Sequence, residues 1–506
     1  MSRRTLAHVA LVVGGLATGV AILLAAELML RVMDIGSDAP VFELAAGADG
    51  APVMRLAWDP QFARPLAVQP HREFPVHKAP GTFRIFVIGE SSAEGVPYGT
   101  DLAFSTWLER RLQAQAPQRH WEVVNAAVAG AQSWSMLTVV RDVARYEPDL
   151  LVVYLGHNEV GTRFSPSERR WLDPRRFTLL GFVTGTRLYR VLASVLPEFP
   201  ATRQLDLRKV HRPGEAFAVV PPNGTRVYAT PADRDVSAAV YRERLVEMVR
   251  AMHAVGAHTM LLTLSQNFSD WEPAVSVHRS GLRPDDKVAW RAAVRAGAAA
   301  VTAHDCEAAL TAWNRALALD DEYAALQFKM ARCEQSLGRM DAAWAHFRKA
   351  SDLDRLPQGA STSFNDILRE VARSEGAILV DVDLALAKAS GPRLVGDDLF
   401  VDAVHPNVRA NQLIAQAVAD AIRATGLAGP ISWRDYADPD PHEALVALDP
   451  ELQTKELLTR ALSHQAAGRT REALRVLAEA AQQTHDPATR SMLEQAIRTS
   501  DEFLTH

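Results

Sequence analysis

The sequence predicts an α/β fold, a flavodoxin-like three-layer sandwich around a five-stranded parallel sheet, with added helices. The five apolar, β-rich stretches that predict it are 83–89, 121–126, 149–155, 258–264 and 376–382. Helical stretches separate them, and such alternation favours parallel pairing with right-handed crossovers. The first three stretches end at small residues followed by polar groups, which indicates a site at the carboxyl edge of the sheet.

Length and composition limit the classes of protein that need to be considered. The chain has 506 residues, which suggests about three domains, and 48% hydrophobic residues provide for ample cores. The net charge of -5 lies on a mixed background without a basic face, which argues against nucleic acid as a partner. The 16 histidines show no recognisable ligand spacing, so we expect neither a metal site nor a cofactor.

The amino-terminal segment, residues 6–30, predicts a transmembrane signal anchor. It opens with a run of about twenty apolar or small residues, which is long enough to cross a bilayer. Arg3 and Arg4 precede it, which predicts a single-pass protein of the cytoplasmic (inner) membrane with its catalytic domain on the periplasmic or extracellular side. A cleaved signal peptide is the alternative. We favour the uncleaved anchor because no convincing cleavage site follows.

Residues 36–80 contain seven prolines and predict an extended, semi-rigid tether between the anchor and the catalytic domain. Alternatively, part of this segment wraps the domain. We expect the α/β domain in two parts, 81–285 and 360–428, with helices inserted at 290–356 and appended at 440–506.

The long excursion at 160–235 is a candidate lid. It opens with five arginines, which would favour an anionic substrate or lipid headgroup near the mouth of the site. A largely apolar stretch at 177–196 follows and could touch an acyl chain or the membrane surface. A solvated charged face followed by a helix on the core explains the same composition, and we favour that alternative.

The inserted helices show a period of 34 residues that resembles tetratricopeptide repeats. The repeated residues are Ala309, Trp313, Ala316 and Asp320, followed by Ala343, Phe347, Ala350 and Asp354. The appended helices carry a related pattern at Gly468, Ala473, Leu477 and Ala480. Such repeats offer a surface to a protein partner, or they are structural and cap the active-site edge. The two cysteines, Cys306 and Cys333, lie in the insertion, where a disulfide and buried thiols both remain open.

A serine, Ser91, follows the first strand stretch after Gly89 and Glu90. At the carboxyl edge of a sheet its hydroxyl would suit a nucleophile, and the amides of the next helix could receive an oxyanion. A turn whose serine merely caps a helix is the alternative for this motif alone.

Further residues complete a set with Ser91. Gly130 follows the second strand stretch, Asn158 follows the third, and Asp402 stands three residues before His405 near the end of the α/β region. Ser, Gly, Asn and His in this order, with that Asp, resemble the SGNH (GDSL-type) hydrolase superfamily over most of residues 83–423. The resemblance implies that Ser91 is the nucleophile and His405 the general base. It also implies that Asp402 orients the imidazole and that Ser91, Gly130 and Asn158 form the oxyanion hole.

Four other polar residues are candidate substrate contacts. Glu90 and Glu159 stand where the superfamily usually has Asp, so each keeps the charge on a longer side chain. Asn267 and Asp270 follow the fourth strand stretch and should also reach the active edge, although Asx-turn formation explains them equally well.

Together these features predict a membrane-anchored serine esterase or deacylase that acts on an ester-bearing substrate, with an O-acyl group on a glycan as the leading expectation. One alternative is an O-acyltransferase of the same fold in envelope polysaccharide modification, because no residue decides between water and a sugar hydroxyl as acceptor. The other is a non-catalytic assembly protein built on the repeats. A pure scaffold has no chemical need for all four residue types, which argues against it.

Overall fold

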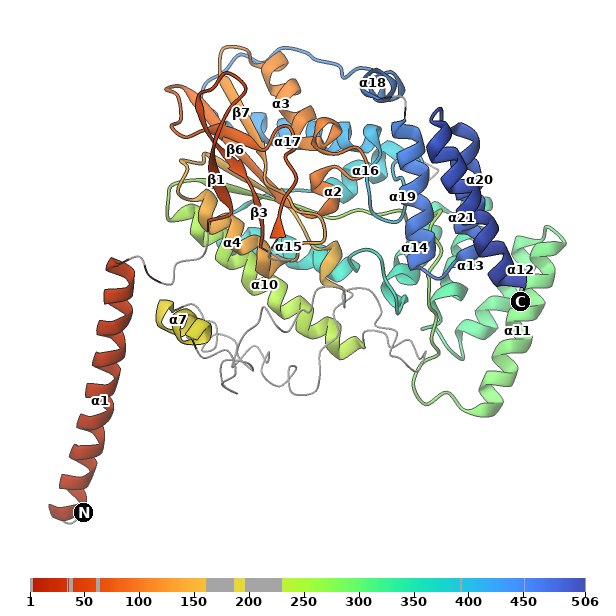
Figure 1. Cartoon of the computed structure of the whole chain (residues 1–506). Helices are drawn as coiled ribbons and strands as arrows, with labels where there is room; N and C mark the ends of the chain where they lie inside the picture. The colour runs from red at the N-terminus through yellow and green to blue at the C-terminus, as the bar shows by residue number, and fades with distance from the viewer. Residues whose placement is uncertain are drawn as a thin grey trace. The chain divides into compact units, whose positions relative to one another are not determined.

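The computed structural model describes residues 3–33, 35, 40–60, 64–160, 186–195, 230–391, 394–449 and 451–505 (Figure 1). The chain divides into two compact units. One consists of Met1–Pro40 and Phe164–Glu215, and the other of Val41–Arg163 and Ala216–His506. We describe each unit by itself.

The smaller unit contains α1 (Arg3–Val32) and α7 (Arg187–Val195). Within α1, Val13–Val32 has a mean hydropathy of 2.0 and no buried part, and it is the one described segment long and apolar enough to cross a membrane. The backbone N–H groups at the start of α7 donate to the Glu27 carboxylate at 3.1 and 3.0 Å. Most of the candidate lid, including its arginines, lies outside the described residues.

The larger unit is built on a five-stranded parallel sheet. Its strands are β6 (Thr82–Gly89), β7 (His120–Asn125), β8 (Leu150–Tyr154), β9 (His258–Leu262) and β10 (Ile378–Val380). They lie side by side in the order β7-β6-β8-β9-β10, and every pair is parallel. This is the doubly wound order of flavodoxin-like proteins, so the predicted fold is confirmed. Every residue of β6 is buried, as expected for a strand with a neighbour on each side.

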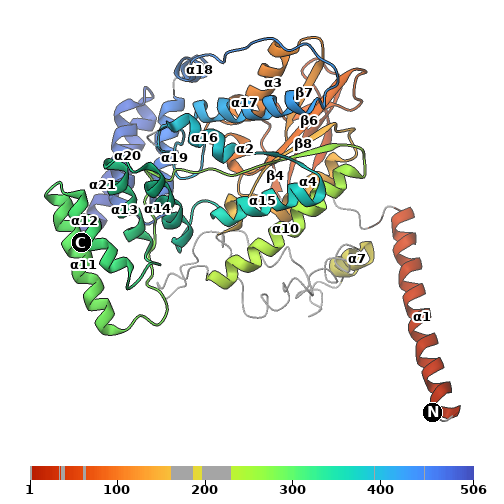
Figure 2. The same ribbon diagram turned by 180° about the vertical axis from the view of Figure 1, so that it is seen from behind.

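Helices cover both faces of this sheet (Figure 1, Figure 2). On one face lie α3 (Phe104–Gln115) and α17 (Val408–Thr425), and on the other α4 (Ser133–Val143), α10 (Pro231–His253) and α15 (Thr362–Glu375). The sequence of α17 shows why it forms: buried Ile414, Val418 and Ile422 recur every fourth residue and make one apolar face. The Asn407 side chain accepts the Ala410 amide in the first turn, and left-handed Gly426 ends the helix.

The described residues between 41 and 75 differ from the predicted tether because they pack on the domain. The strands β1 (Phe42–Ala46), β2 (Pro52–Leu56) and β5 (Glu73–Pro75) form an antiparallel sheet in that order, and β3 (Trp58–Asp59) pairs with β4 (Arg64–Pro65). Phe42 and Phe74 are buried and meet Phe86 of β6 edge to face, with ring centroids 6.2 and 5.1 Å away. Part of the segment therefore wraps the domain, since burial of these rings outweighs the stiffness of the prolines.

Four helices are inserted between β9 and β10. They are α11 (Pro284–Thr302), α12 (Cys306–Leu317), α13 (Ala324–Ser336) and α14 (Met340–Leu353). The alanines and aromatic residues of the repeat pattern are at most 2% exposed, as close helix packing requires. Cys306 and Cys333 form a disulfide between α12 and α13, which settles the choice that the sequence left open. That these helices are tetratricopeptide repeats stays a prediction, as do the domain boundaries.

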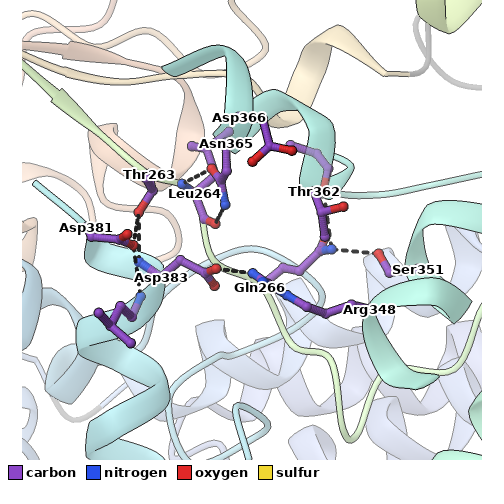
Figure 3. Close-up of polar contacts among 12 residues, drawn as sticks. Thr263, Leu264, Gln266, Arg348, Ser351, Thr362, Asn365, Asp366, Asp381 and Asp383 are labelled. Carbon is purple, nitrogen blue, oxygen red and sulfur yellow. Dashed lines mark hydrogen bonds and ion pairs between the residues drawn. The ribbon is translucent and has the colours of Figure 1, made fainter. Parts of the chain in front are cut away.

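A polar network at the carboxyl end of β9 ties the insertion to the α/β domain (Figure 3). Gln266 donates to the Ser351 hydroxyl of α14 at 2.6 Å, and Arg348 of the same helix forms an ion pair with Asp383. The Asp383 amide in turn donates to the Thr263 hydroxyl at 3.0 Å. The insertion is thus fixed next to a strand end at the active edge.

The last helices are α18 (Pro441–Leu448), α19 (Leu452–Ala466), α20 (Thr470–Gln483) and α21 (Pro487–Thr505). Consecutive helices in this group pack against each other, and α19 also reaches the loops that follow the sheet. Leu477 and the alanines of the third repeat pattern lie at or against the buried seam of α20.

Candidate active site

The turn from β6 into the short helix α2 (Ser91–Glu94) places Ser91 at the carboxyl edge of the sheet. Only glycine fits at Gly89, because a Cβ there would lie 2.1 Å from the Tyr154 carbonyl oxygen and 2.5 Å from Cβ of Ala93. The sharp turn leaves the Ser91 side chain partly exposed. Its hydroxyl is therefore open to a ligand, unlike that of neighbouring Ser92, which is buried and donates to the Val404 carbonyl at 3.0 Å.

The structure brings Ser91, His405 and Asp402 into one hydrogen-bonded chain. His405 Nε2 lies 2.9 Å from Ser91 Oγ, and His405 Nδ1 lies 2.7 Å from Asp402 Oδ2. With Nδ1–H donating to the carboxylate, Nε2 accepts the serine proton. This arrangement can activate the hydroxyl for attack on a carbonyl carbon.

Asp402 is 1% exposed, yet it is held in its charged form. Burial alone would raise its pKa, but the charge of His405 and hydrogen bonds from His405 and Ser463 outweigh burial and lower the pKa to about 2. For His405, burial acts to lower the pKa, and the neighbouring Asp402 charge reverses this and raises it above the ordinary value. The pair therefore favours an imidazolium once His405 has taken a proton.

Glu90 is a structural residue. It is buried, and its carboxylate accepts the backbone N–H groups of Gly156, His157 and Asn158 at 3.0, 2.5 and 2.9 Å. Burial raises the pKa of Glu90 to about 8 despite these donors. The Glu90 side chain, one methylene longer than Asp, reaches these three amides and so fixes the loop that follows β8 to the Ser91 turn. Its carboxyl group is not placed as a substrate contact.

The predicted oxyanion residues lie on loops that are joined to each other. Asn158 donates from Nδ2 to the Ala131 carbonyl at 3.1 Å, and Gln132 donates to the Asn158 carbonyl at 2.6 Å. One carboxamide hydrogen of Asn158 remains available. In the described part of the chain, the N–H groups of Ser91 and Gly130 donate to no protein acceptor.

The remaining candidate contacts have structural partners as well. Glu159 is buried, accepts the Ser133 amide, and has a pKa that burial raises to about 7. The Asp270 amide donates to the Asn267 side-chain oxygen at 3.0 Å, which is the Asx-turn alternative. Asn267 also donates to Asp397 at 2.7 Å, and Asp270 pairs with Arg332 at 3.1 Å.

Two residues near the site were missed by the sequence analysis. One is His157, which the sequence analysis covered only among the 16 histidines without ligand spacing; burial lowers its pKa to about 3, and its Nδ1 accepts the Ala360 amide at 3.2 Å. Ser463 of α19 donates to Asp402 at 2.6 Å. No local motif marks a serine so distant in the chain, whereas His157 could have been noted for its place beside Asn158.

A cavity of about 420 Å³ is separate from the hydrogen-bonded chain, because neither Ser91, Asp402 nor His405 lines it. Its lining residues come from α18, α19 and α20 and from the two stretches that flank Asp402 and His405, namely Asp397, Phe400, Val401, Asn407, Val408 and Arg409. Its lining mixes acids and bases, among them Asp397, Glu456, Arg409 and Arg460. Within the described residues, no group of three or more His, Cys, Asp or Glu side chains could hold a metal ion.

A family model matches part of the chain. Residues 87–329 match the model of the GDSL-like lipase/acylhydrolase family, a range that contains Ser91, Gly130 and Asn158 and ends before Asp402 and His405. The inserted helices separate the two parts of the set. No curated protein sequence matches the chain.

Several solved structures are similar to the chain at low identity. LAE5, an alpha/beta hydrolase enzyme from the metagenome of Lake Arreo, Spain, is 16% identical over 69% of this chain and 97% of its own, with a TM-score of 0.30. Axe2, an acetylxylan esterase from Geobacillus stearothermophilus, is 13% identical over 70% and 97%, with a TM-score of 0.31. The acetyl xylan esterase AlAXEase is 11% identical over 67% and 100%, with a TM-score of 0.31.

Proposed function

Because the chain carries a GDSL-like lipase/acylhydrolase domain and is thus an ester-hydrolysing enzyme, we propose that it is a serine esterase in which Ser91 is the nucleophile. His405 is the general base and Asp402 orients it. The observation that carries the proposal is the hydrogen-bonded chain from Ser91 Oγ through His405 to Asp402, with distances of 2.9 and 2.7 Å.

In the proposed reaction, His405 Nε2 takes the proton of Ser91 while Oγ attacks the carbonyl carbon of the ester. The carbonyl oxygen becomes an oxyanion, which the amides of Ser91 and Gly130 and the carboxamide of Asn158 receive. The imidazolium, stabilised by Asp402, then gives its proton to the leaving alkoxide. Water, deprotonated by His405, attacks the acyl-serine and releases the acid and the free serine.

Within this class we propose an O-acylated glycan as substrate and a position outside the cytoplasm. The proposal of this substrate rests on the resemblance of the Ser, Gly, Asn and His motifs to the SGNH superfamily and not on a pocket residue. The position is supported by Arg3 and Arg4 ahead of the apolar helix. The Cys306–Cys333 disulfide also supports it, because disulfides persist mainly in oxidising compartments.

The full chain in detergent, assayed for p-nitrophenyl acetate turnover, tests the catalytic assignment. We expect Ser91→Ala to abolish turnover and labelling by a fluorophosphonate probe, and the matched control Ser374→Ala, at an exposed serine of α15, to keep both. Turnover that persists in Ser91→Ala would contradict the proposal. Addition of an oligosaccharide acceptor then separates hydrolysis from acyl transfer, because transfer yields an acylated oligosaccharide.

A fusion of alkaline phosphatase to the carboxyl end tests the membrane topology, since this reporter is active only outside the reducing cytoplasm. We expect an active reporter on a full-length, membrane-bound protein. An active reporter on a shortened, soluble protein would indicate a cleaved signal peptide, and an inactive reporter would contradict the position.

A further inference from the structure

The helix α19 contributes a side chain to the proposed catalytic chain, although it lies beyond the α/β region in the sequence. Ser463 Oγ donates to Asp402 Oδ2 at 2.6 Å. This is the same carboxylate oxygen that faces His405 Nδ1 at 2.7 Å. Ser463 and His405 therefore share one acceptor atom.

The two oxygens of Asp402 are held in different ways. Oδ1 accepts the backbone N–H groups of Val404 and His405, both at 2.9 Å, so it is fixed by its own loop. Oδ2 has the His405 ring on one side and the Ser463 hydroxyl on the other. Among the hydrogen bonds to Asp402 in the described part of the chain, the bond from Ser463 is the one that comes from another element.

Contacts of Ser463 and of its neighbours on α19 hold this part of the helix in place. Its carbonyl oxygen accepts Gln358 Nε2 at 2.9 Å, and the next residue, His464, stacks on Trp271 with ring centroids 4.4 Å apart. One turn earlier, Arg460 Nε donates to the Val401 carbonyl at 2.6 Å, directly before Asp402. These contacts dock α19 on the loop that carries Asp402.

A further contact joins α19 to the loop that follows Ser91. The Tyr98 hydroxyl, which is buried, forms a hydrogen bond with Glu456 of α19. The helix therefore bridges the loop after the proposed nucleophile and the loop of the proposed base. An element that only covered the surface would not need polar contacts to both loops.

We propose that Ser463 is a positioning residue for the acyl-transfer reaction, which holds Asp402 Oδ2 toward His405 and makes full activity depend on docked α19. This inference rests on the proposed function. A hydroxyl donor to a carboxylate fixes the direction of its lone pairs, and the orientation of the imidazole follows from that direction. The appended helices would thus be part of the catalytic machinery rather than a separate module.

The test compares Ser463→Ala with Thr459→Ala, which removes a hydroxyl one turn earlier on α19, where the described residues show no hydrogen bond from it to the Asp402 loop. In the full chain we expect Ser463→Ala to lower kcat for p-nitrophenyl acetate about tenfold, equivalent to about 1.4 kcal/mol, with KM unchanged. Without this donor Asp402 Oδ2 is held less firmly toward His405 and stabilises the imidazolium less, so the acid limb of the kcat profile should move to lower pH. Thr459→Ala should change neither.

Ser463→Thr and Ser463→Val form a second matched pair of nearly equal volume that differs in the hydroxyl. We expect Thr to retain most of the activity and Val to behave like Ala, and thermal unfolding will show whether each variant is folded. Equal kcat values for Thr and Val, or a Ser463→Ala enzyme within twofold of wild type, would overturn the inference while an inactive Ser91→Ala leaves the proposed function intact. An active Ser91→Ala would overturn both.

Discussion

The loop that carries Ser91 and the loop that carries His405 each contain a buried carboxyl group, and the pKa values of these two groups are shifted in opposite directions. The pKa of Glu90 is raised to about 8, whereas that of Asp402 is lowered to about 2. Both are about 1% exposed and both accept backbone N–H donors. Burial and backbone hydrogen bonds are therefore not what separates them.

The difference lies in the charged neighbours. Asp402 contacts the cation that forms on His405, while Glu90 has only backbone dipoles as partners and senses the negative charge of Glu159. A formal opposite charge can outweigh desolvation, and three amide dipoles do not do so here. Glu90, which holds the Ser91 loop, thus keeps its proton to higher pH than a free carboxyl, whereas Asp402, which holds the His405 loop, stays ionised to lower pH.

The largest effect should follow from removal of the Asp402 charge. We expect Asp402→Asn to lower kcat by roughly 10³- to 10⁴-fold, because the carboxamide no longer stabilises the imidazolium and can select the wrong tautomer. The acid limb of activity, which in the wild type should lie above pH 6.5 since the pKa of His405 is raised, should move to lower pH. The control is Asp366→Asn, at an exposed side chain of α15. A decrease in kcat of less than tenfold would contradict a catalytic role for the Asp402 charge.

Removal of the Glu90 carboxyl should act on folding. In Glu90→Ala three buried or partly buried amides lose their acceptor, which we expect to lower the free energy of unfolding by roughly 3 kcal/mol or more. Urea unfolding of the full chain measures this change. An unfolding free energy within about 0.5 kcal/mol of the wild-type value would show that the loop after β8 does not need Glu90.

Removal of the disulfide should leave both loops unchanged. We expect Cys306→Ser combined with Cys333→Ser to lower the stability of the inserted helices by about 2–4 kcal/mol. The kcat value should stay within twofold of wild type, because neither cysteine contacts the Ser91 or the Asp402 loop. Limited proteolysis locates the loss, and a tenfold decrease in kcat would show that the insertion controls the site.

The subtlest test concerns the pH dependence of stability. The pKa of Glu90 is raised from 4.5 to about 8, so its contribution to stability is full below pH 4.5 and is lost as the pH rises toward 8. Glu90→Gln cannot ionise and should flatten the stability profile within this window. Urea unfolding between pH 5 and 8 or so measures the slope. An unchanged slope would assign the dependence to Glu159, whose pKa is also raised, to about 7.

The five-stranded parallel sheet follows from the sequence because each strand is a short apolar run and helical stretches separate the runs. The set of Ser91, Gly130, Asn158, Asp402 and His405 was predicted from the resemblance of its motifs to the SGNH superfamily. These signals are local. They survive the insertion of four helices between the last two strands since the insertion leaves the strands themselves intact.

Long-range contacts explain what the sequence left out. The hydrogen bond from Ser463 to Asp402 spans 61 residues and involves a serine with no distinctive neighbours. Burial of Phe42 and Phe74 turned a proline-rich segment into a small sheet, and nothing local shows that Phe86 completes the cluster. The sequence shows that Glu90 has a longer side chain than the usual Asp, but the amides that this side chain reaches belong to a loop 66 to 68 residues away.

The placement of Ser463 has a consequence for the order in which the protein is made. Synthesis runs from the amino end, so Ser91 is made long before its partner His405, which lies 314 residues further along, and Ser463 follows 61 residues after Asp402. If Ser463 acts as proposed, the nascent chain carries a complete sheet and a weakly active serine until α19 has been made and has docked. Full esterase activity would then be reached only once α19 is in place, and loss of the last helices by proteolysis would lower the activity before the α/β domain unfolds.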